Sequence, residues 1–247
     1  MRPTLLVVQN AEWEGPGLIE THAKAACVDI VIAKLFGKAH AGAIPFKDIR
    51  KGYFCAVVAL GSPSTAYLPK SNPHHSELVR LFRLVRRMKI PSFNVCYSMQ
   101  LFCLAHGGSV VKNPLGKEVG FIEVQPTQEG RSDPVIGSVA PYTTLQWHGD
   151  IVDRLPRGAV RLAYSKLTNN QVAVLDGIHY LLQSDGQAAT PMMVRSWLRH
   201  DAAWATKDTG VRGAELVREA SDREAYFRNG FFRVFANFLS LALEPHA

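Results

Sequence analysis

Short apolar runs alternate, along the first hundred residues, with segments whose apolar positions recur every three to four residues. Each run has the length of one strand, and the runs are residues 4–8, 28–32, 55–60 and 92–95. The segments with helical spacing are residues 18–26, 75–88 and 97–106. Fully apolar strands joined by helices are typical of a parallel sheet that is covered on both faces. The pattern therefore predicts an α/β fold.

From residue 109 onward the pattern changes. Short strand-like segments follow one another between Gly, Pro and Asn turns, at 109–111, 119–125, 159–163, 171–175 and 178–183. They predict an antiparallel or mixed extension of the sheet. Residues 190–200 and about 211–243 have helical spacing, and the last segment is strongly apolar on one face. We expect a main domain at 1–200 and a helical C-terminal extension at 201–247, whose apolar face packs on the core or forms a subunit contact.

The composition is that of a globular protein. The chain has 247 residues, of which 47% are hydrophobic and 20% charged, enough for one sizeable core. No apolar run reaches the ~18 residues of a membrane span. The run Leu5-Leu6-Val7-Val8 is too short for the apolar region of a secretory signal, so we expect a cytoplasmic protein.

The chemistry-bearing residues exclude several classes of protein. Four cysteines without a CxxC pair or a Cys/His cluster predict neither a disulfide framework nor a metal site. No phosphate loop or cofactor fingerprint is present, so we expect no cofactor. The net charge is +7, and its densest stretch, residues 80–89, alternates Arg and Lys with apolar residues at helical spacing. This is typical of the solvated face of a helix, and we expect a small-molecule substrate rather than nucleic acid.

Cys96 is the first candidate site residue, since strand 92–95 runs directly into it and a helix follows. Such a turn projects the side chain above the carboxyl edge of the sheet, and the helix N-terminus, beginning at Tyr97, supplies N–H groups for an oxyanion. Gly61 and Ser62 follow strand 55–60 and reach the same edge, where their N–H groups can complete the oxyanion hole. In the alternative reading Cys96 is a small core residue and Gly61-Ser62-Pro63 an ordinary turn.

A second polar segment, Gln146-Trp147-His148-Gly149-Asp150, has the composition of a turn. A histidine beside Gly and Asp can bind a ligand or transfer a proton, although solvated turn histidines are more common.

Together these segments resemble the class I glutamine amidotransferases, the triad glutaminases, and within them the branch of the GMP synthetase glutaminase and the gamma-glutamyl peptidases. The resemblance covers roughly residues 50–200. Its parts occur in the family's order: VVALGSPSTAY, IPSFNVCYSMQLFCLAHGGSVVKNP, KEVGFIEVQPT, QWHGDIVDRLPRGAVRLAYS and VAVLDGIHYLLQSDGQAATPMMVRSWL. The resemblance implies a flavodoxin-like, mostly parallel sheet with helices on both faces.

The family's nucleophile motif, Gly-x-Cys-x-Gly-x-Gln, is partly kept. It reads Asn94-Val95-Cys96-Tyr97-Ser98-Met99-Gln100, so the Cys and the Gln match and both glycines are replaced. The resemblance implies that Cys96 is the nucleophile. It further implies a substrate pocket lined by Gln100, Trp147, Gly149 and Asp150.

The family's base motif, Gln-Phe-His-Pro-Glu, is not kept. The aligned segment is Gln183-Ser184-Asp185-Gly186-Gln187, so Asp185 stands at the His position and Gln187 at the Glu position. A carboxylate beside the thiol raises the pKa of the thiol instead of stabilising the thiolate. We therefore expect ordinary glutamine hydrolysis to be lost. Another histidine, His148, His74 or His75, remains a possible substitute base.

Three functions stay open. In the first, the chain is a divergent enzyme of a specialised biosynthetic pathway that keeps Cys96 for a substrate other than free glutamine, with Asp185 as acid or base or as the group that binds a cationic substrate. In the second, the chain is a non-catalytic pseudo-glutaminase that binds a ligand or a partner synthase, or pairs with a second copy through the C-terminal helices. In the third, a substituted base preserves a working glutamine amidotransferase.

Overall fold

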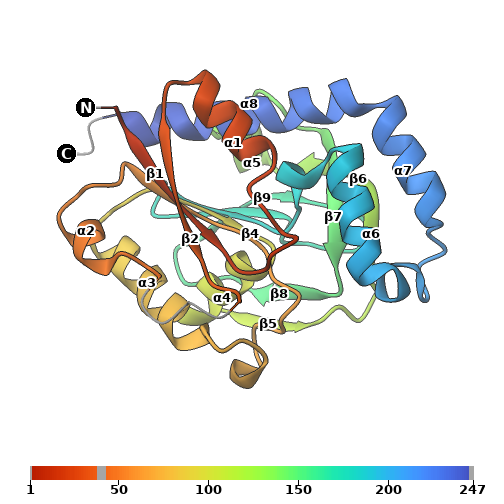
Figure 1. The fold of residues 1–247 in the computed structure, drawn as a ribbon, viewed down its shortest axis with the longest axis horizontal. Helices are drawn as coiled ribbons and strands as arrows, with labels where there is room; N and C mark the ends of the chain where they lie inside the picture. The colour runs from red at the N-terminus through yellow and green to blue at the C-terminus, as the bar shows by residue number, and fades with distance from the viewer. Residues whose placement is uncertain (1, 38–42, 245–247) are drawn as a thin grey trace.

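The computed structural model describes residues 2–37 and 43–244 of the chain. A large central sheet contains nine strands in the order β2-β1-β3-β4-β11-β10-β9-β6-β7, and β5 and β8 form a separate pair (Figure 1). The strands are β1 Thr4–Gln9, β2 Asp29–Lys34, β3 Ala56–Ala59, β4 Ser92–Val95, β5 Ser109–Lys112, β6 Glu118–Pro126, β7 Tyr142–His148, β8 Asp150–Arg154, β9 Val160–Tyr164, β10 Val172–Leu175 and β11 His179–Leu182.

The sheet has a parallel and an antiparallel half. Strands β2, β1, β3, β4 and β11 pair in parallel, and β10, β9, β6 and β7 continue the sheet in antiparallel pairs. The parallel half has the strand order of a flavodoxin-like sheet. This architecture confirms the predicted α/β fold with its antiparallel extension.

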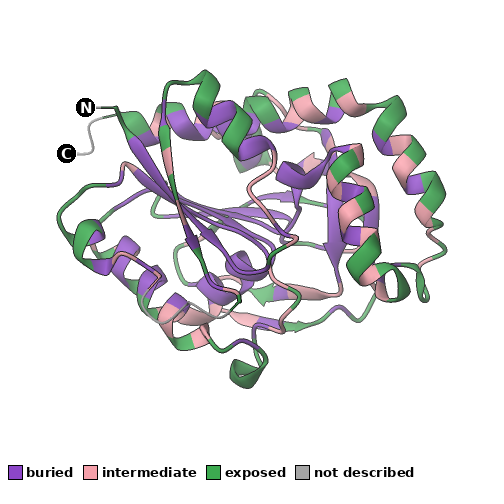
Figure 2. Ribbon diagram, viewed as in Figure 1, coloured by how far each residue is buried: buried purple, intermediate pink, exposed green. Residues whose placement is uncertain are grey.

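Helices cover both faces of the sheet, and their bounds are α1 Leu18–Ala25, α2 Phe46–Arg50, α3 His75–Arg87, α4 Tyr97–Ala105, α5 Gln128–Ser132, α6 Pro191–Thr206, α7 Gly213–Asp222 and α8 Glu224–Leu243. Helices α1 and α8 share one apolar core with the parallel strands, and α2, α3 and α4 share a second core with the opposite face. A third core joins β6 and β7 to α6, α7 and the start of α8. Strands β1, β3, β4 and β11 are buried between these layers, whereas β2, at the edge of the sheet, is largely exposed (Figure 2).

The basic stretch forms the outer face of α3, as predicted. The helix buries its apolar positions and leaves the basic ones at its surface. Arg86 pairs with Asp176 at 2.8 Å, and the guanidinium of Arg80 lies 3.8 Å from the centre of the Phe46 ring.

The segment Gln146–Asp150 is not a turn, and this prediction was wrong. It spans the end of β7 and the start of β8, with Gly149 alone between them. The segment is polar, which in a sequence indicates an exposed turn. In the structure the side chains of Gln146 and His148 lie inside the protein, where they contact Gln171 and Glu118. Residues 144–148 do alternate polar and apolar side chains as a strand does, but both sets are buried, and the Gly and Asp that follow gave the segment the composition of a turn.

The C-terminal helices pack closely on the rest of the chain. Helix α6 runs across residue 200, where the sequence pattern suggests a boundary, and α8 lies along one face of the sheet (Figure 1). The rings of Phe235 and Phe238 lie 5.5 and 5.1 Å from that of Phe93 on β4. The apolar face of α8 therefore packs on the core of its own chain. None of the helices in the described ranges is both long and apolar enough to cross a membrane.

Candidate active site

The carboxyl ends of four neighbouring parallel strands bring the candidate residues together. The loop after β1 carries Glu14, β3 is followed by Gly61, β4 by Cys96 and β11 by Asp185. Because these strands are adjacent and parallel, residues that are far apart in the sequence meet at one edge of the sheet.

Cys96 occupies a strained elbow between β4 and α4. Its backbone has φ 49° and ψ −112°, values that are unfavourable for a residue with a side chain, and its N–H donates to the Leu182 oxygen at 2.7 Å. Such strain persists where the surrounding structure enforces it, most often at functional sites. The turn places Cys96 at the N-terminus of α4, as the strand–turn–helix pattern predicts.

The two residues that replace the family's glycines make polar contacts within the scaffold. Asn94 donates from Nδ2 to Ser92 Oγ at 2.9 Å and to the Tyr180 oxygen at 3.2 Å. Ser98 donates from its hydroxyl to the Leu60 oxygen at 2.6 Å. Both side chains thereby tie the elbow to neighbouring strands.

Asp185 lies directly beside the thiol. It is 1% exposed, its N–H donates to the Leu145 oxygen at 2.8 Å, and its carboxyl accepts hydrogen bonds from the Cys96 thiol and from Gln187 Nε2, the latter at 3.3 Å. Burial raises the pKa of Asp185 to about 7, although both hydrogen bonds act in the opposite direction. At neutral pH this carboxyl is therefore poised between its two protonation states.

Glu14 is a site residue that the sequence analysis missed. Its carboxyl approaches Gly61 so closely that a Cβ at that glycine would lie 2.5 Å from Glu14 Oε2, 3.3 Å from Asp185 Oδ1 and 3.6 Å from the Cβ of Cys96. Burial raises the pKa of Glu14 well above its usual range, and the charges of Asp185 and Asp201 raise it further. Gly61 thus leaves room for two carboxyls and a thiol to converge.

The thiol of Cys96 is held in its neutral form. Burial raises its pKa well above the ordinary value, Asp185 and Glu14 add to this shift, and the N–H of Tyr97 opposes it. Gln183 also contacts the thiol, because its Nε2 lies 3.7 Å from Sγ. Gln100 continues this chain of amides, with its Nε2 2.9 Å from the Asp150 oxygen and 3.3 Å from Gln183 Oε1.

A cavity of about 470 Å³ opens in front of these groups. Four tryptophans line it, namely Trp13, Trp147, Trp197 and Trp204. Its lining also includes the predicted residues Ser62, Cys96, Tyr97, Gln100, Trp147, His148, Gly149, Asp150 and Asp185. Gln187 is buried behind Asp185, and Gly61 lies between Cys96 and Glu14. The volume suits a small organic molecule.

The predicted oxyanion groups remain available. Within the described part of the chain, the N–H groups of Gly61 and Ser62 donate to no other residue. The hydroxyl of Ser62 contacts that of Ser64 at 3.0 Å, which shapes the loop after β3.

The three candidate substitute bases, His148, His74 and His75, lie in three different environments. His148 lines the cavity, but its Nε2 lies 3.3 Å from Glu118 Oε2, and both side chains are 2% exposed. His74 contacts Glu77 at 3.3 Å at the start of α3, and His75 lies in a separate groove with arginines of that helix. In residues 2–37 and 43–244, no histidine is among the groups that affect the pKa of Cys96.

The described ranges hold no group of three His, Cys, Asp or Glu side chains with the geometry of a metal site. All four cysteines are free. The groups around the Cys96 thiol itself are the carboxyls of Glu14 and Asp185 and the amide of Gln183.

The residues missed by the sequence analysis come from loops and helices far from Cys96 in the chain. Glu14, Trp13, Trp197, Asp201 and Trp204 show no spacing that links them to the elbow. The one available signal was an acidic residue, Glu14, shortly after a parallel strand, since such positions reach the carboxyl edge of the sheet.

Comparison with known proteins supports the family resemblance. Residues 61–176 match the family model described as Glutamine amidotransferase class-I. Over 84 residues, 33% of this chain and 44% of the relative, it is 39% identical to a glutamine-hydrolyzing GMP synthase subunit of Natronomonas pharaonis. Over 129 residues, 49% of this chain and 22% of the relative, it is 29% identical to the GMP synthase of Nitratiruptor sp.. The chain thus spans less than half the length of these curated relatives.

Solved structures share the fold over almost the whole chain. A glutamine amidotransferase of Thermotoga maritima has a TM-score of 0.80 at 19% identity and covers 97% of this chain and 99% of its own. One from Methylobacillus flagellatus has a TM-score of 0.82 at 22% identity, with coverage of 100% and 97%.

Proposed function

We propose that the chain, which resembles class I glutamine amidotransferases over residues 61–176 and shares their fold, is a cysteine-dependent enzyme acting on a substrate other than free glutamine. In this proposal Asp185 and Gln187 stand where the family has its His and Glu. The enzyme then has a Cys96–Asp185 pair instead of a Cys–His pair.

The position of the Asp185 carboxyl beside Cys96 is the observation that carries the proposal, since a Cβ at Gly61 would lie 3.3 Å from Asp185 Oδ1 and 3.6 Å from the Cβ of Cys96. A glutaminase works with a thiolate beside an imidazolium, whereas here the surrounding acids keep the thiol neutral. The pKa of Asp185, about 7, is that of a general base suited to neutral pH. Gln187 Nε2 orients this carboxyl, as the third member of a triad orients its base.

The proposed reaction is an acyl transfer with balanced proton movements. As Sγ bonds to the carbonyl carbon of the substrate, the thiol proton passes to the Asp185 carboxylate. The bond to the leaving group breaks as Asp185 returns that proton to the departing atom. Water, with Asp185 again accepting its proton, then adds to the thioester carbon, and the bond to Sγ breaks as Asp185 returns this proton to Sγ, which releases the acid and restores the thiol. The free N–H groups of Gly61 and Ser62, with that of Tyr97, are suited to stabilising the oxyanion in both halves.

Intact-protein mass spectrometry with a panel of amide, ester and amidine substrates tests this proposal. We expect a covalent adduct on Cys96 with at least one substrate class, absent in Cys96→Ala and slowed in Asp185→Asn, and no glutamate release from L-glutamine. Glutamate release that is abolished by Cys96→Ala would show instead that an ordinary glutaminase survives.

Non-catalytic binding is the second candidate, and the raised pKa of the thiol favours it. In this case the cavity binds a ligand or the chain acts beside a synthase, a possibility suggested by the relative whose name makes it one subunit of a GMP synthase. A stable complex with a synthase on size-exclusion chromatography, together with no adduct on Cys96 from any substrate class, supports this candidate over catalysis.

A further inference from the structure

We infer that the cavity beside Cys96 binds a cationic nitrogen group, such as a guanidinium, amidinium or ammonium, between the Glu14 carboxyl and the tryptophan wall formed by Trp13, Trp147, Trp197 and Trp204. The inference rests on the proposed function in one respect, because it takes this cavity to be the substrate pocket. It adds the chemical class of the substrate.

The first argument is the unpartnered state of Glu14. Its side chain lines the cavity, the residue is 9% exposed, and its carboxyl accepts no hydrogen bond from any residue in the described ranges. A buried carboxyl without a donor is costly in either protonation state. A ligand that donates N–H groups from the cavity removes this cost.

The second argument is the charge balance. Glu14 is electrostatically coupled to Asp185 and Asp201, and no cation of the described chain is among the groups that affect its pKa. The same holds for Asp185. Burial raises its pKa, and the groups that oppose this shift are Gln187 and Cys96, neither of which is a cation. The acids at the inner end of the cavity therefore lack a counter-charge from the described part of the protein itself.

The third argument is the aromatic lining. The Trp147 ring lies 5.5 Å from that of Trp197 and 6.5 Å from that of Trp204. Tryptophan is the aromatic side chain that attracts cations most strongly. The wall already has this chemistry with a cation of the chain, since Lys117 Nζ lies 4.7 Å from the centre of the Trp204 ring.

Two of the lysines that line the cavity, Lys112 and Lys117, have partners elsewhere, and the charge of Lys112 acts on Asp150. Lys117 donates to the main-chain oxygens of Trp204 and Lys207, at 2.7 and 3.0 Å, and so is held away from the carboxyls by these bonds. A ligand cation at Glu14 would also stabilise ionised Asp185 and the Cys96 thiolate, since it sits within the same cluster. Binding of the substrate would thereby help to activate the nucleophile.

A matched pair of probes, n-butylguanidinium and n-butylurea, tests the inference by titration calorimetry at pH 8. The two have nearly the same shape and differ in charge. We expect the guanidinium to bind at least about tenfold more tightly, and Glu14→Gln to abolish this preference. Glu12→Gln, an exposed acid of the same loop, is the matched control and should retain the full preference.

A test without a substitution complements the variants. Lowering the pH to 4.5 protonates Glu14 and Asp185, because their pKa values are raised. The preference of the wild-type protein for the guanidinium should therefore fall at least severalfold. The other titratable groups beside Glu14 are Asp201 and Cys96. Equal binding of the two probes, no binding of the guanidinium, or an unchanged preference in Glu14→Gln would each overturn the inference.

Repeating the titration in Cys96→Ala separates this inference from the proposed function. Cation binding that persists there, in a protein without any Cys96 adduct chemistry, supports the site even where catalysis fails. Cys96-dependent turnover of a neutral substrate, with no preference between the probes, supports catalysis and overturns the cation site.

Discussion

The indole N–H of Trp147, on β7, donates to Asp201 Oδ2 at 3.0 Å. Asp201 is the one position inside α6 with non-helical backbone angles, φ −136° and ψ 17°, so the bond joins the antiparallel half of the sheet to a kink in the helix above the cavity. Trp147→Phe leaves this carboxylate without its donor. We expect a loss of about 1–3 kcal/mol in the free energy of unfolding, measured in urea.

Trp204→Phe is the control for this change. The Trp204 indole N–H makes no hydrogen bond within the described ranges, so this variant has a smaller ring but leaves no carboxylate without its donor. Equal losses in the two variants would mean that ring packing, and not the bond to Asp201, supports the wall.

Replacing Asp185 should raise stability at alkaline pH. In the unfolded chain this carboxyl ionises near its ordinary value of 3.8, whereas burial raises its pKa to about 7 in the folded protein. The folded state therefore holds a proton that the unfolded state releases between these values, and stability falls as the pH rises through this window. Asp185→Asn should remove at most about 4 kcal/mol of this loss at pH 8 and change little at pH 4.

Asp176→Asn provides a control of opposite sign. The pKa of this carboxyl is lowered, mainly by its hydrogen bond to Arg86, so ionisation favours the folded state. Its removal should slightly reduce the melting temperature at neutral pH and have no effect at low pH. A melting temperature of Asp185→Asn below that of the wild type at pH 8 would contradict the assignment of Asp185 as a costly buried acid.

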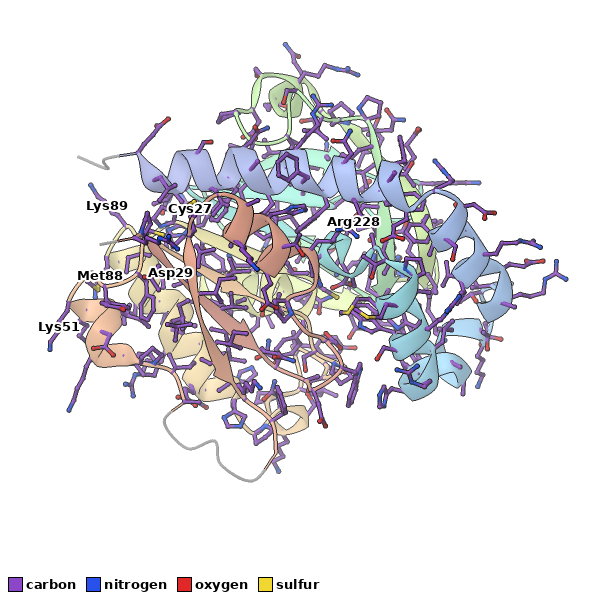
Figure 3. The ribbon with its side chains drawn as sticks, turned by 45° about the horizontal axis from the view of Figure 1, so that its top comes forward. Cys27, Asp29, Lys51, Met88, Lys89 and Arg228 are labelled. Carbon is purple, nitrogen blue, oxygen red and sulfur yellow. The ribbon has the colours of Figure 1, made fainter. Side chains whose placement is uncertain are left out.

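Alkylation rates report the state of the thiol. We expect the iodoacetamide reaction of Cys96 to require a higher pH than that of Cys27, because burial and the neighbouring acids raise the Cys96 pKa. Cys27 is exposed after α1, at the end of the molecule where β2 begins, and is the internal standard (Figure 3). Peptide mapping by mass spectrometry resolves the two sites.

The same experiment in Glu14→Gln should shift the Cys96 profile to lower pH, because one of the groups that raises its pKa is removed. A Cys96 profile below that of Cys27 in the wild-type protein would reveal a positive partner at the thiol, and a histidine base would then replace Asp185 in the proposed mechanism.

If Asp185 and Gln187 stand at the His and Glu positions, as the proposed function has it, then introducing His and Glu there should produce glutaminase activity. Asp185→His with Gln187→Glu supplies an imidazole to take the thiol proton and a carboxylate to orient it. We expect glutamate release from L-glutamine at least about 100-fold above that of the wild-type protein. Asp185→His alone should gain less activity, and adding Cys96→Ala to the double variant should abolish the gain. A folded double variant that shows no measurable glutaminase activity would argue that the cavity excludes glutamine.

Gly186→Ala should destabilise the protein through α8. A Cβ there would lie 2.7 Å from Phe231 Cδ2 and 2.9 Å from Thr144 Oγ1, so the ring or the backbone after β11 must move. We expect a cost of about 1–3 kcal/mol in urea unfolding. Gly230→Ala, in α8 itself and with no atom within 4 Å of the new Cβ, should be neutral or stabilising by about 1 kcal/mol.

Strands β1 to β4 could be predicted because each contains a short apolar run, and Cys96 stood out because strand, cysteine and helix follow one another without a gap. The pattern did not show that β11, expected in the antiparallel or mixed extension, pairs in parallel with β4. Strand β7 could not, since Gln146 and His148 are polar residues whose partners, Gln171 and Glu118, are distant in the sequence. Glu14 could not either. Its proximity to Cys96 depends on β1 lying beside β3, a pairing that no local pattern encodes.

Helix α8 contacts the chain next to Asp185 from outside the cavity. Phe231 presses against Gly186, the residue next to Asp185, while the opposite side of the same helix turn faces solvent (Figure 2). Substitutions in α8 are therefore expected to shift Asp185 without changing any residue that lines the cavity, and a search for altered activity should include this helix in its libraries.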